Sequence, residues 1–160
     1  MKVADILKTK RRAGNILSVK EGDATSVAIG IMVENDTGSV VVYRNDGMFM
    51  GMLTFREVLI VMHRDGYEAG AHLRCGDIMD REHMSCATPE DTIDNIRAMM
   101  TDNHIRYLPV VQDGKLTDVI SFYDVARTIA KAANYENRLL KEYIRNWPEQ
   151  AGETEDADGK

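Results

Sequence analysis

The stretch IRYLPVVQDGKLTDVISFYD, residues Ile105–Asp124, decides the fold of this chain. It opens with Tyr107–Val111, a short apolar run rich in residues that favour β-strands, and Asp113-Gly114 supplies a tight turn. Leu116–Ile120 is then the return strand. Ser121 is a favoured N-cap residue, so a helix should begin directly after it. The stretch therefore predicts a β-hairpin that leads straight into a helix.

The chain contains this pattern twice. Shifting the sequence by 67 positions aligns Ser39–Glu57 with Arg106–Asp124 without a gap. The turn Asp46-Gly47 then falls on Asp113-Gly114, and the helix start TFRE falls on SFYD. An internal repeat of this kind indicates two copies of one structural unit.

Each copy should carry further elements in the same order. A brief extended segment, Ile16–Val19 in the first copy and Met84–Ala87 in the second, precedes a helix whose apolar residues recur at spacings of three and four. The pattern predicts an α/β fold of two β-α-β-β-α units, and because one such unit has a thin core, the two should pack together. The apolar helix positions are Val27, Ala28, Ile31 and Met32 in the first copy and Ile93, Ile96, Met99 and Met100 in the second.

The repeats also predict where the chain divides. A connector between them contains Gly66 and Gly70, which should interrupt any helix, so we expect this connector to be exposed. The expected boundaries are 1–63 for the first repeat, 64–74 for the connector, 75–130 for the second repeat, 131–147 for a C-terminal helix extension and 148–160 for an acidic tail.

The helix after Asp124 continues further than the repeat requires, until Pro148 ends it. Its last turns carry an apolar stripe that needs a cover, which either the first repeat or a second copy of the chain would supply. The tail that follows has five acidic side chains against one lysine and too little apolar surface to fold, so we expect it to be solvated. The stripe consists of Leu139, Leu140, Tyr143, Ile144 and Trp147.

The composition, with 44% hydrophobic and 29% charged residues, is that of a globular protein. The sequence has no apolar run near the roughly 20 residues that cross a bilayer. The first residues, MKVADILKTKRRAG, also lack the apolar core of a secretory signal. We therefore expect a cytoplasmic protein without a membrane partner. The net charge of −6 and the shortness of the basic run Lys8–Arg12 argue against a nucleic-acid partner.

The two cysteines, Cys75 and Cys86, are too few for a disulfide framework. Together with His72 and His83 they are of the residue types that bind zinc, so a metal-binding module is one alternative. Cysteine is more commonly a small buried side chain that serves packing. No metal ligand is therefore assigned.

The second copy resembles a cystathionine β-synthase (CBS) domain. Ile105–Val111 is similar to the family's strand ending in Leu-Pro-Val, and Val119–Val125 is similar to its Val-Ile-Ser-x-x-Asp-Val segment. With the first copy, the resemblance covers about residues 3–130 and is that of a stand-alone tandem CBS pair, or Bateman module. It implies two repeats packed as a pseudo-twofold pair.

The resemblance implies an adenosine-containing ligand, such as AMP, ADP, ATP, S-adenosylmethionine or NAD, in the cleft between the repeats. A carboxylate can accept both ribose hydroxyls, which suits Asp124. Ser121 would contact ribose or phosphate oxygens beside the first amides of the helix. The preceding strand would contact adenine through Ile105, Tyr107 and Pro109, and phosphate through Arg106.

The first copy departs from this pattern because Glu57 stands where the second copy has Asp124. Arg56 matches an arginine that often faces phosphates in the family, so Thr54, Arg56 and Glu57 are weaker candidates for ligand contacts. We expect two unequal sites, of which the one in the second copy matches the family's ligand-binding pattern better. Asp118, in the return strand, places an extra carboxylate there that would disfavour a polyphosphate.

The sequence shows no nucleophile–base pair, and its four histidines lie apart without an HExxH context. We therefore expect a non-catalytic sensor that requires no cofactor, forms a homodimer and is read by an effector protein that the sequence does not identify. The alternatives are a structural dimerisation module without a ligand, the metal-binding module and an unrecognised enzyme.

Overall fold

The structure is a computed structural model that describes residues 1–10, 15–82 and 84–146. The expectations for Arg11, Arg12, His83, Trp147 and the tail 148–160 therefore lie outside the described residues. The chain divides into two compact units, Met1–Ala126 and Arg127–Lys160. The first repeat and all but the last residues of the second repeat lie in the first unit, so the α/β fold of the two repeats can be followed within that unit.

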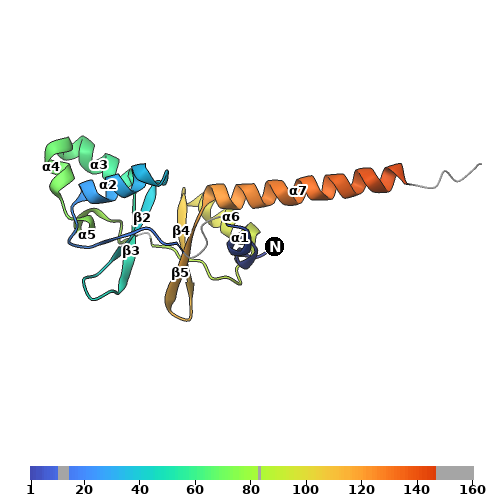
Figure 1. Cartoon of the computed structure of the whole chain (residues 1–160), viewed down its shortest axis with the longest axis horizontal. Coiled ribbons are helices and arrows are strands. Elements are labelled where there is room, and N and C mark those ends of the chain that lie inside the picture. The colour runs from blue at the N-terminus through green and yellow to red at the C-terminus, as the bar shows by residue number, and fades with distance from the viewer. Residues whose placement is uncertain (11–14, 83, 147–160) are drawn as a thin grey trace, which may run out of the picture. The chain divides into compact units, whose positions relative to one another are not determined.

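The first repeat forms a three-stranded sheet in the order β1-β2-β3 (Figure 1). Strand β1 (Ser18–Lys20) pairs parallel with β2 (Ser39–Tyr43), and β2 pairs antiparallel with β3 (Phe49–Thr54). Helices α2 (Thr25–Glu34) and α3 (Phe55–Asp65) complete the repeat. Its core is built from buried side chains of these elements, which are Val19, Ala28, Met32, Val40, Val42, Leu53 and Val58.

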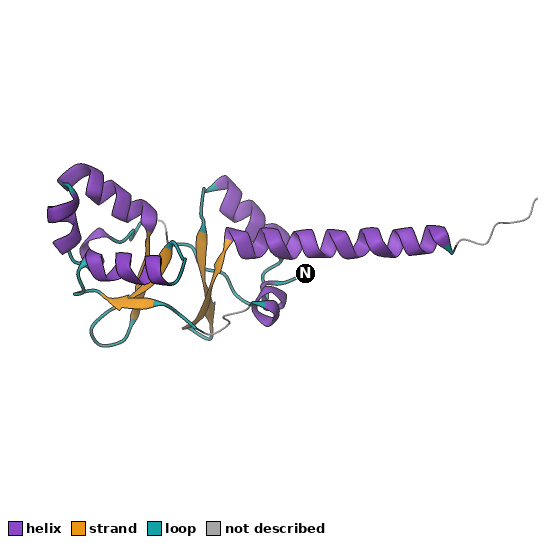
Figure 2. Ribbon diagram, turned by 45° about the horizontal axis from the view of Figure 1, so that its top comes forward, coloured by secondary structure: helices purple, strands orange, loops and turns teal. Residues whose placement is uncertain are grey.

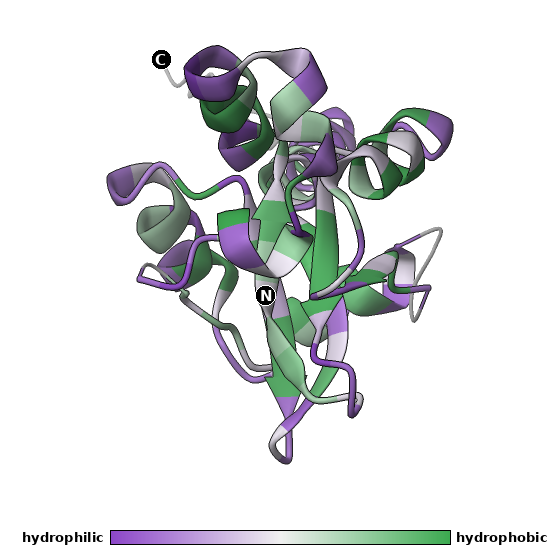
Figure 3. Ribbon diagram, turned by 90° about the vertical axis from the view of Figure 1, so that its left-hand side faces the viewer, coloured by the Kyte–Doolittle hydropathy of each residue, from purple (hydrophilic) through white to green (hydrophobic). Residues whose placement is uncertain are grey.

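The second repeat has the same hairpin, formed by β4 (Tyr107–Gln112) and β5 (Lys115–Ser121). Helix α6 (Ile93–Asp102) precedes this hairpin and α7 (Phe122–Arg145) follows it (Figure 2). The extended segment expected before α6 is reduced to one parallel bridge between Ala87 and Val110. The strands of the molecule are apolar over most of their length, while the connecting loops are largely polar (Figure 3).

The short first helix of each repeat packs on the other repeat. Helix α1 (Val3–Thr9) is joined to the second repeat, because the Val3 amide donates to the Asp91 carbonyl at 2.9 Å. Helix α5 (Cys75–Ile78) is joined to the first repeat in the equivalent way, with the Cys75 amide donating to the Asp23 carbonyl at 2.8 Å. The two repeats therefore exchange their first helices.

The connector contains a helix, α4 (Tyr67–His72), so the expectation that Gly70 interrupts any helix is wrong. Most residues of the connector are exposed, as expected. Gly70 is buried, and a Cβ atom there would lie 3.1 Å from side-chain atoms of both Val61 and Met62. Gly66, at φ +81°, makes the junction between α3 and α4. Gly70 therefore permits close packing of α4 on α3 and does not break the helix.

Helix α7 is long and continuous, with 24 residues (Figure 2). The four side chains of its apolar stripe that the structure describes are exposed, from 44% at Leu139 to 71% at Ile144. No helix in residues 1–10, 15–82 and 84–146 combines the length with the apolar character that a membrane crossing requires.

Candidate ligand-binding cleft

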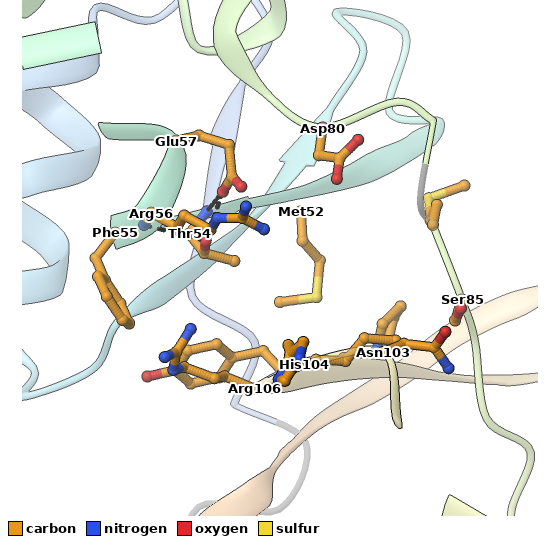
Figure 4. A pocket seen from close by; sticks show the side chains of 14 residues that line it. Met52, Thr54, Phe55, Arg56, Glu57, Asp80, Ser85, Asn103, His104 and Arg106 are labelled. Carbon is orange, nitrogen blue, oxygen red and sulfur yellow. Dashed lines mark hydrogen bonds between the residues drawn. The ribbon is translucent and has the colours of Figure 1, made fainter. Parts of the chain in front are cut away.

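A cavity of about 410 Å³ lies in the first unit, between the β3–α3 junction of the first repeat and the start of β4 in the second (Figure 4). This volume falls in the range of small-molecule binding sites, about 300 to 1,000 Å³. The lining includes Thr54, Arg56 and Glu57 from the first repeat. From the second repeat it includes the four strand candidates, Ile105, Arg106, Tyr107 and Pro109.

Thr54 and Glu57 are held in place by a capping box at the start of α3. The Glu57 Oε2 atom accepts hydrogen bonds from the Thr54 amide, at 2.8 Å, and from the Thr54 hydroxyl. The Thr54 Oγ1 atom in turn accepts from the Arg56 amide at 3.3 Å. Because both of the carboxylate's capping bonds use Oε2, the Glu57 Oε1 atom stays outside the box. The cap therefore fixes the orientation of a carboxylate that lines the cavity.

The opposite wall is joined to the first repeat by aromatic contacts. The Arg106 guanidinium carbon lies 5.5 Å from the centroid of the Phe55 ring, within the range of a cation–π contact. Tyr107 packs against Gly38, where a Cβ atom would lie 2.4 Å from the Tyr107 hydroxyl oxygen and 2.7 Å from Phe55. Glycine at position 38 therefore lets the two repeats approach closely beside the cavity.

Three further lining residues come from the segment after α5: Asp80, Met84 and Ser85. Sequence reasoning missed these residues, because nothing in their local pattern indicates that the segment passes the β3–α3 junction. It also missed His104 and Asn103, at the end of α6, where His104 has φ +55°.

The charges of the cleft come in two kinds. Arg56 and Arg106 are cations suited to phosphate or carboxylate groups, while Glu57 and Asp80 are carboxylates suited to hydroxyl or cationic groups (Figure 4). The arginines stand on opposite walls, one from each repeat. Such an arrangement can bind a ligand that carries an anionic group and several hydroxyls.

Ser121 and Asp124 do not line this cavity. They form the equivalent capping box at the start of α7, where the Asp124 Oδ2 atom accepts from the Ser121 amide and from the Ser121 hydroxyl, both at 2.8 Å. The cleft thus combines the strand of the second copy with the helix start of the first. That Ser121 and Asp124 contact a ligand stays a prediction.

Asp118 does not act as an additional open carboxylate. Its Oδ1 atom lies 2.6 Å from the Lys10 Nζ atom, and its side chain is only 5% exposed. The expectation that this carboxylate disfavours a polyphosphate therefore lacks its physical basis, because the charge of Asp118 is balanced by a lysine.

The cysteines differ from each other in their surroundings. Cys75 is buried, its thiol donates to the Ala24 carbonyl at 3.5 Å, and burial raises its pKa to about 11. Cys86 is exposed. The described residues contain no group of three or more His, Cys, Asp or Glu side chains that could hold a metal ion. His83, the fourth candidate zinc ligand, is outside these residues.

The sequence model of the CBS domain matches residues 3–64 and again residues 75–131. The chain belongs to the CBS-domain family. A relative is the CBS domain-containing protein CBSX3, mitochondrial, of Arabidopsis thaliana, with 28% identity over 148 residues, which cover 89% of this chain and 71% of the relative.

Solved CBS-domain structures share this fold. A protein from Agrobacterium tumefaciens superimposes with a TM-score of 0.73 at 26% identity, over 79% of this chain and 91% of that one. A protein with CBS domains from Burkholderia ambifaria MC40-6 gives a TM-score of 0.72 at 28% identity, over 81% and 93%. The chain is therefore a tandem CBS pair, a regulatory type of module.

Proposed function

We propose that this CBS pair is a non-catalytic sensor that binds an adenosine-containing ligand in the cleft between the β3–α3 junction and β4. One observation carries the proposal: the cavity brings a fixed carboxylate, two arginines and an apolar strand together from both repeats. Because the walls belong to different repeats, a bound ligand would favour one relative arrangement of them. A partner protein would then read that arrangement.

Glu57 would bind the ribose. Its carboxylate is oriented by the Thr54 cap, and its Oε1 atom is not used in that cap. A vicinal diol offers two hydroxyl donors, which a carboxylate accepts well. The longer side chain of Glu57, compared with Asp124, carries this carboxylate one methylene further from the helix.

Arg56 and Arg106 would bind the phosphate or carboxylate end of the ligand. Arg56 follows Thr54 at the start of α3, where the helix dipole also favours an anion. Arg106 lies over Phe55 in the structure, so binding would exchange a cation–π contact for a charge-assisted hydrogen bond. The adenine ring would lie against Ile105, Tyr107 and Pro109.

Calorimetric titration with AMP, 2′-deoxy-AMP, ATP, S-adenosylmethionine and NADH tests the proposal. Glu57→Gln is the informative variant, because a glutamine at this position still accepts the capping bonds while the charge is lost. We expect the variant to bind AMP roughly ten-fold more weakly and to lose most of the preference for AMP over its 2′-deoxy analogue.

Asp124→Asn is the matched control, since it makes the same change in the other capping box. It should leave the affinity of this cleft unchanged. If Asp124→Asn weakens binding and Glu57→Gln does not, the ligand occupies the other helix start and the assignment to this cleft is wrong. If the wild-type chain binds none of the five ligands, the sensor proposal itself fails in favour of a structural module.

A further inference from the structure

The end of helix α6 contributes Asn103 to the cleft, a residue to which the proposed function gives no role. Asn103 is the C-cap of the helix, and its backbone amide donates to the Met99 carbonyl at 3.2 Å. Its side-chain Nδ2 atom donates to the same carbonyl at 3.0 Å. The side chain of Asn103 is therefore tied back to the helix that carries it.

This bond decides which end of the Asn103 amide faces the cavity. A carbonyl oxygen can only accept a hydrogen bond, so the group that meets the Met99 carbonyl must be the NH₂ group. The Oδ1 atom is at the other end of the planar amide, and in Figure 4 it points toward Ser85, which also lines the cavity. Asn103 therefore presents a hydrogen-bond acceptor to a ligand.

Asn103 lies at the end of the cavity that is remote from the arginines. In Figure 4, Arg56 and Glu57 stand on one side of the cavity and Asn103 and Ser85 on the other, with Met52 between them. A nucleotide whose phosphate binds Arg56 and whose ribose binds Glu57 would extend its base toward Asn103.

We propose that Asn103 selects the base of the ligand, because its Oδ1 atom accepts a hydrogen bond from the 6-amino group of adenine and disfavours a purine with a 6-oxo group. This inference rests on the proposed function and adds a specificity-determining residue to it. The amino group of adenine is a donor, whereas the O6 atom of guanine or hypoxanthine is an acceptor. Two acceptors that face each other exclude water and gain no hydrogen bond, which costs binding free energy.

Other polar residues of the cavity are less selective. The Ser85 hydroxyl and the His104 imidazole can each donate and accept, so they suit either kind of purine. Asp80 is a second acceptor, and its Oδ1 atom already accepts from the Glu82 amide at 2.9 Å. Selectivity for a 6-amino group should therefore come from Asn103, and Asp80 is the alternative that the experiment must separate from it.

The first repeat supplies a matched control, because its helix α2 ends in the same way. Asn35 is the C-cap of α2, and its Nδ2 atom donates to the Ile31 carbonyl at 2.9 Å. Asn35 is outside the described lining of this cavity. The two asparagines therefore separate a role in capping a helix from a role in the cleft.

Calorimetric titration with AMP and inosine 5′-monophosphate (IMP), which differ at position 6 of the base, tests the role of Asn103. The wild-type chain should bind AMP at least about ten-fold more tightly than IMP. Asn103→Ala should reduce this ratio of affinities to within about two-fold, chiefly by weakening AMP. Asn35→Ala should lose a similar amount of stability in urea and keep the ratio.

A second variant separates the acceptor from its tether. Asn103→Asp keeps an oxygen acceptor and loses the hydrogen bond to the Met99 carbonyl. Since AMP and IMP carry the same charge, the new carboxylate affects both phosphates alike. Asn103→Asp should therefore still prefer AMP over IMP, and circular dichroism checks that each variant is folded.

Three results would overturn the inference. Equal affinity of the wild-type chain for AMP and IMP would remove the selectivity and leave the proposed function intact. A preference for AMP that survives in Asn103→Ala would contradict the role of Asn103, and its loss in Asp80→Ala or Asn35→Ala would show which residue carries it. A wild-type chain that binds neither nucleotide would overturn the proposed function together with this inference.

Discussion

Lys10 and Asp118 form an ion pair across 108 positions of the chain, with 2.6 Å between the Lys10 Nζ and Asp118 Oδ1 atoms. The side chains are 18% and 5% exposed. Lys10 also donates to the Val119 carbonyl, and the Val119 amide donates to Asp118 at 2.7 Å. The pair therefore fastens the chain that follows α1 to strand β5 of the second repeat.

Replacing Lys10 should destabilise the protein. In Lys10→Met the stem of the side chain is kept, but the buried Asp118 carboxylate loses its lysine, so we expect a loss of roughly 3 kcal/mol in the free energy of unfolding. Urea denaturation measures this loss. Lys8→Met is the control, because the Lys8 side chain is 76% exposed and should change stability by less than about 0.5 kcal/mol. Equal losses in the two variants would contradict the role given to the pair.

Adding a methyl group at Gly38 should disturb the cleft. In Gly38→Ala the new Cβ atom would lie 2.4 Å from the Tyr107 hydroxyl oxygen, so Tyr107 or Phe55 must move. We expect a destabilisation of about 1 to 3 kcal/mol, together with weaker binding of the cleft ligand.

A second glycine provides the comparison for Gly38. Gly30 lies inside α2, and a Cβ atom there has nothing within 4 Å. Gly30→Ala should therefore stabilise the protein by about 0.5 to 1 kcal/mol, through the higher helix propensity of alanine. Thermal and urea denaturation of both variants would test this difference between Gly38 and Gly30. Changes of the same sign in the free energy of unfolding would refute it.

The two thiols should differ in reactivity. Burial raises the pKa of Cys75 to about 11, so little thiolate forms at neutral pH, and its side chain is fully buried. A thiol reagent should modify Cys86 alone in the folded protein and both cysteines in urea. Cys86→Ser should then leave no reactive thiol in the folded state, and rapid labelling of that variant would show that Cys75 is accessible.

The same pKa shift predicts an alkaline loss of stability. An unfolded thiol ionises at a pH near 8.5 to 9, below the value of about 11 in the folded state. Between these values the unfolded chain binds fewer protons, so stability should fall as pH rises from about 9 to about 11. The fall should be smaller in Cys75→Ala when both proteins are followed by urea denaturation at several pH values.

Ser121 should contribute to stability whether or not it contacts a ligand. Its Oγ atom accepts from the Asp124 amide at 3.1 Å, so Ser121→Ala removes a helix cap and should cost about 1 kcal/mol. Ser121→Thr should restore most of this stability, because threonine also caps. If Ser121→Ala unfolds at the same urea concentration as the wild type, the cap is not a stabilising element.

Most of the fold could be predicted because the sequence contains the pattern of the same structural unit twice. The hairpin and the helix after it recur without a gap, and each strand that forms lies within one or two residues of its expected position. The extended segment expected at Met84–Ala87 forms only a single bridge. The exchange of α1 and α5 could not be predicted, since Val3–Leu7 resembles Cys75–Met79 in sequence and the resemblance does not say which repeat each segment contacts. Gly70 was misread because a glycine that permits contact looks the same in sequence as one that breaks a helix.

The cleft was predicted in its parts and not in their combination. Strand residues such as Tyr107 and helix-start residues such as Thr54 both line it, as does Glu57. The second copy is more similar to the CBS family's pattern than the first, so the sequence favoured the helix start at Ser121 over the one at Thr54. The cavity combines the helix start of the first repeat with the strand of the second. This combination depends on how the repeats pack and not on how closely either motif matches the family.

The exchange of α1 and α5 also determines which of these helices can dock first during biosynthesis. Helix α1 leaves the ribosome before the rest of the two repeats, yet its hydrogen-bond acceptors, the Pro89 and Asp91 carbonyls, emerge more than 80 residues later. At 5 to 20 residues per second this is a wait of roughly 4 to 16 seconds. During that time the buried faces of Val3 and Ile6 have no docking site of their own, whereas α5 finds the first repeat already made. Within the two repeats the nascent chain is therefore most vulnerable at α1, and a chaperone that shields Val3–Thr9 would act at the step where this fold is least protected.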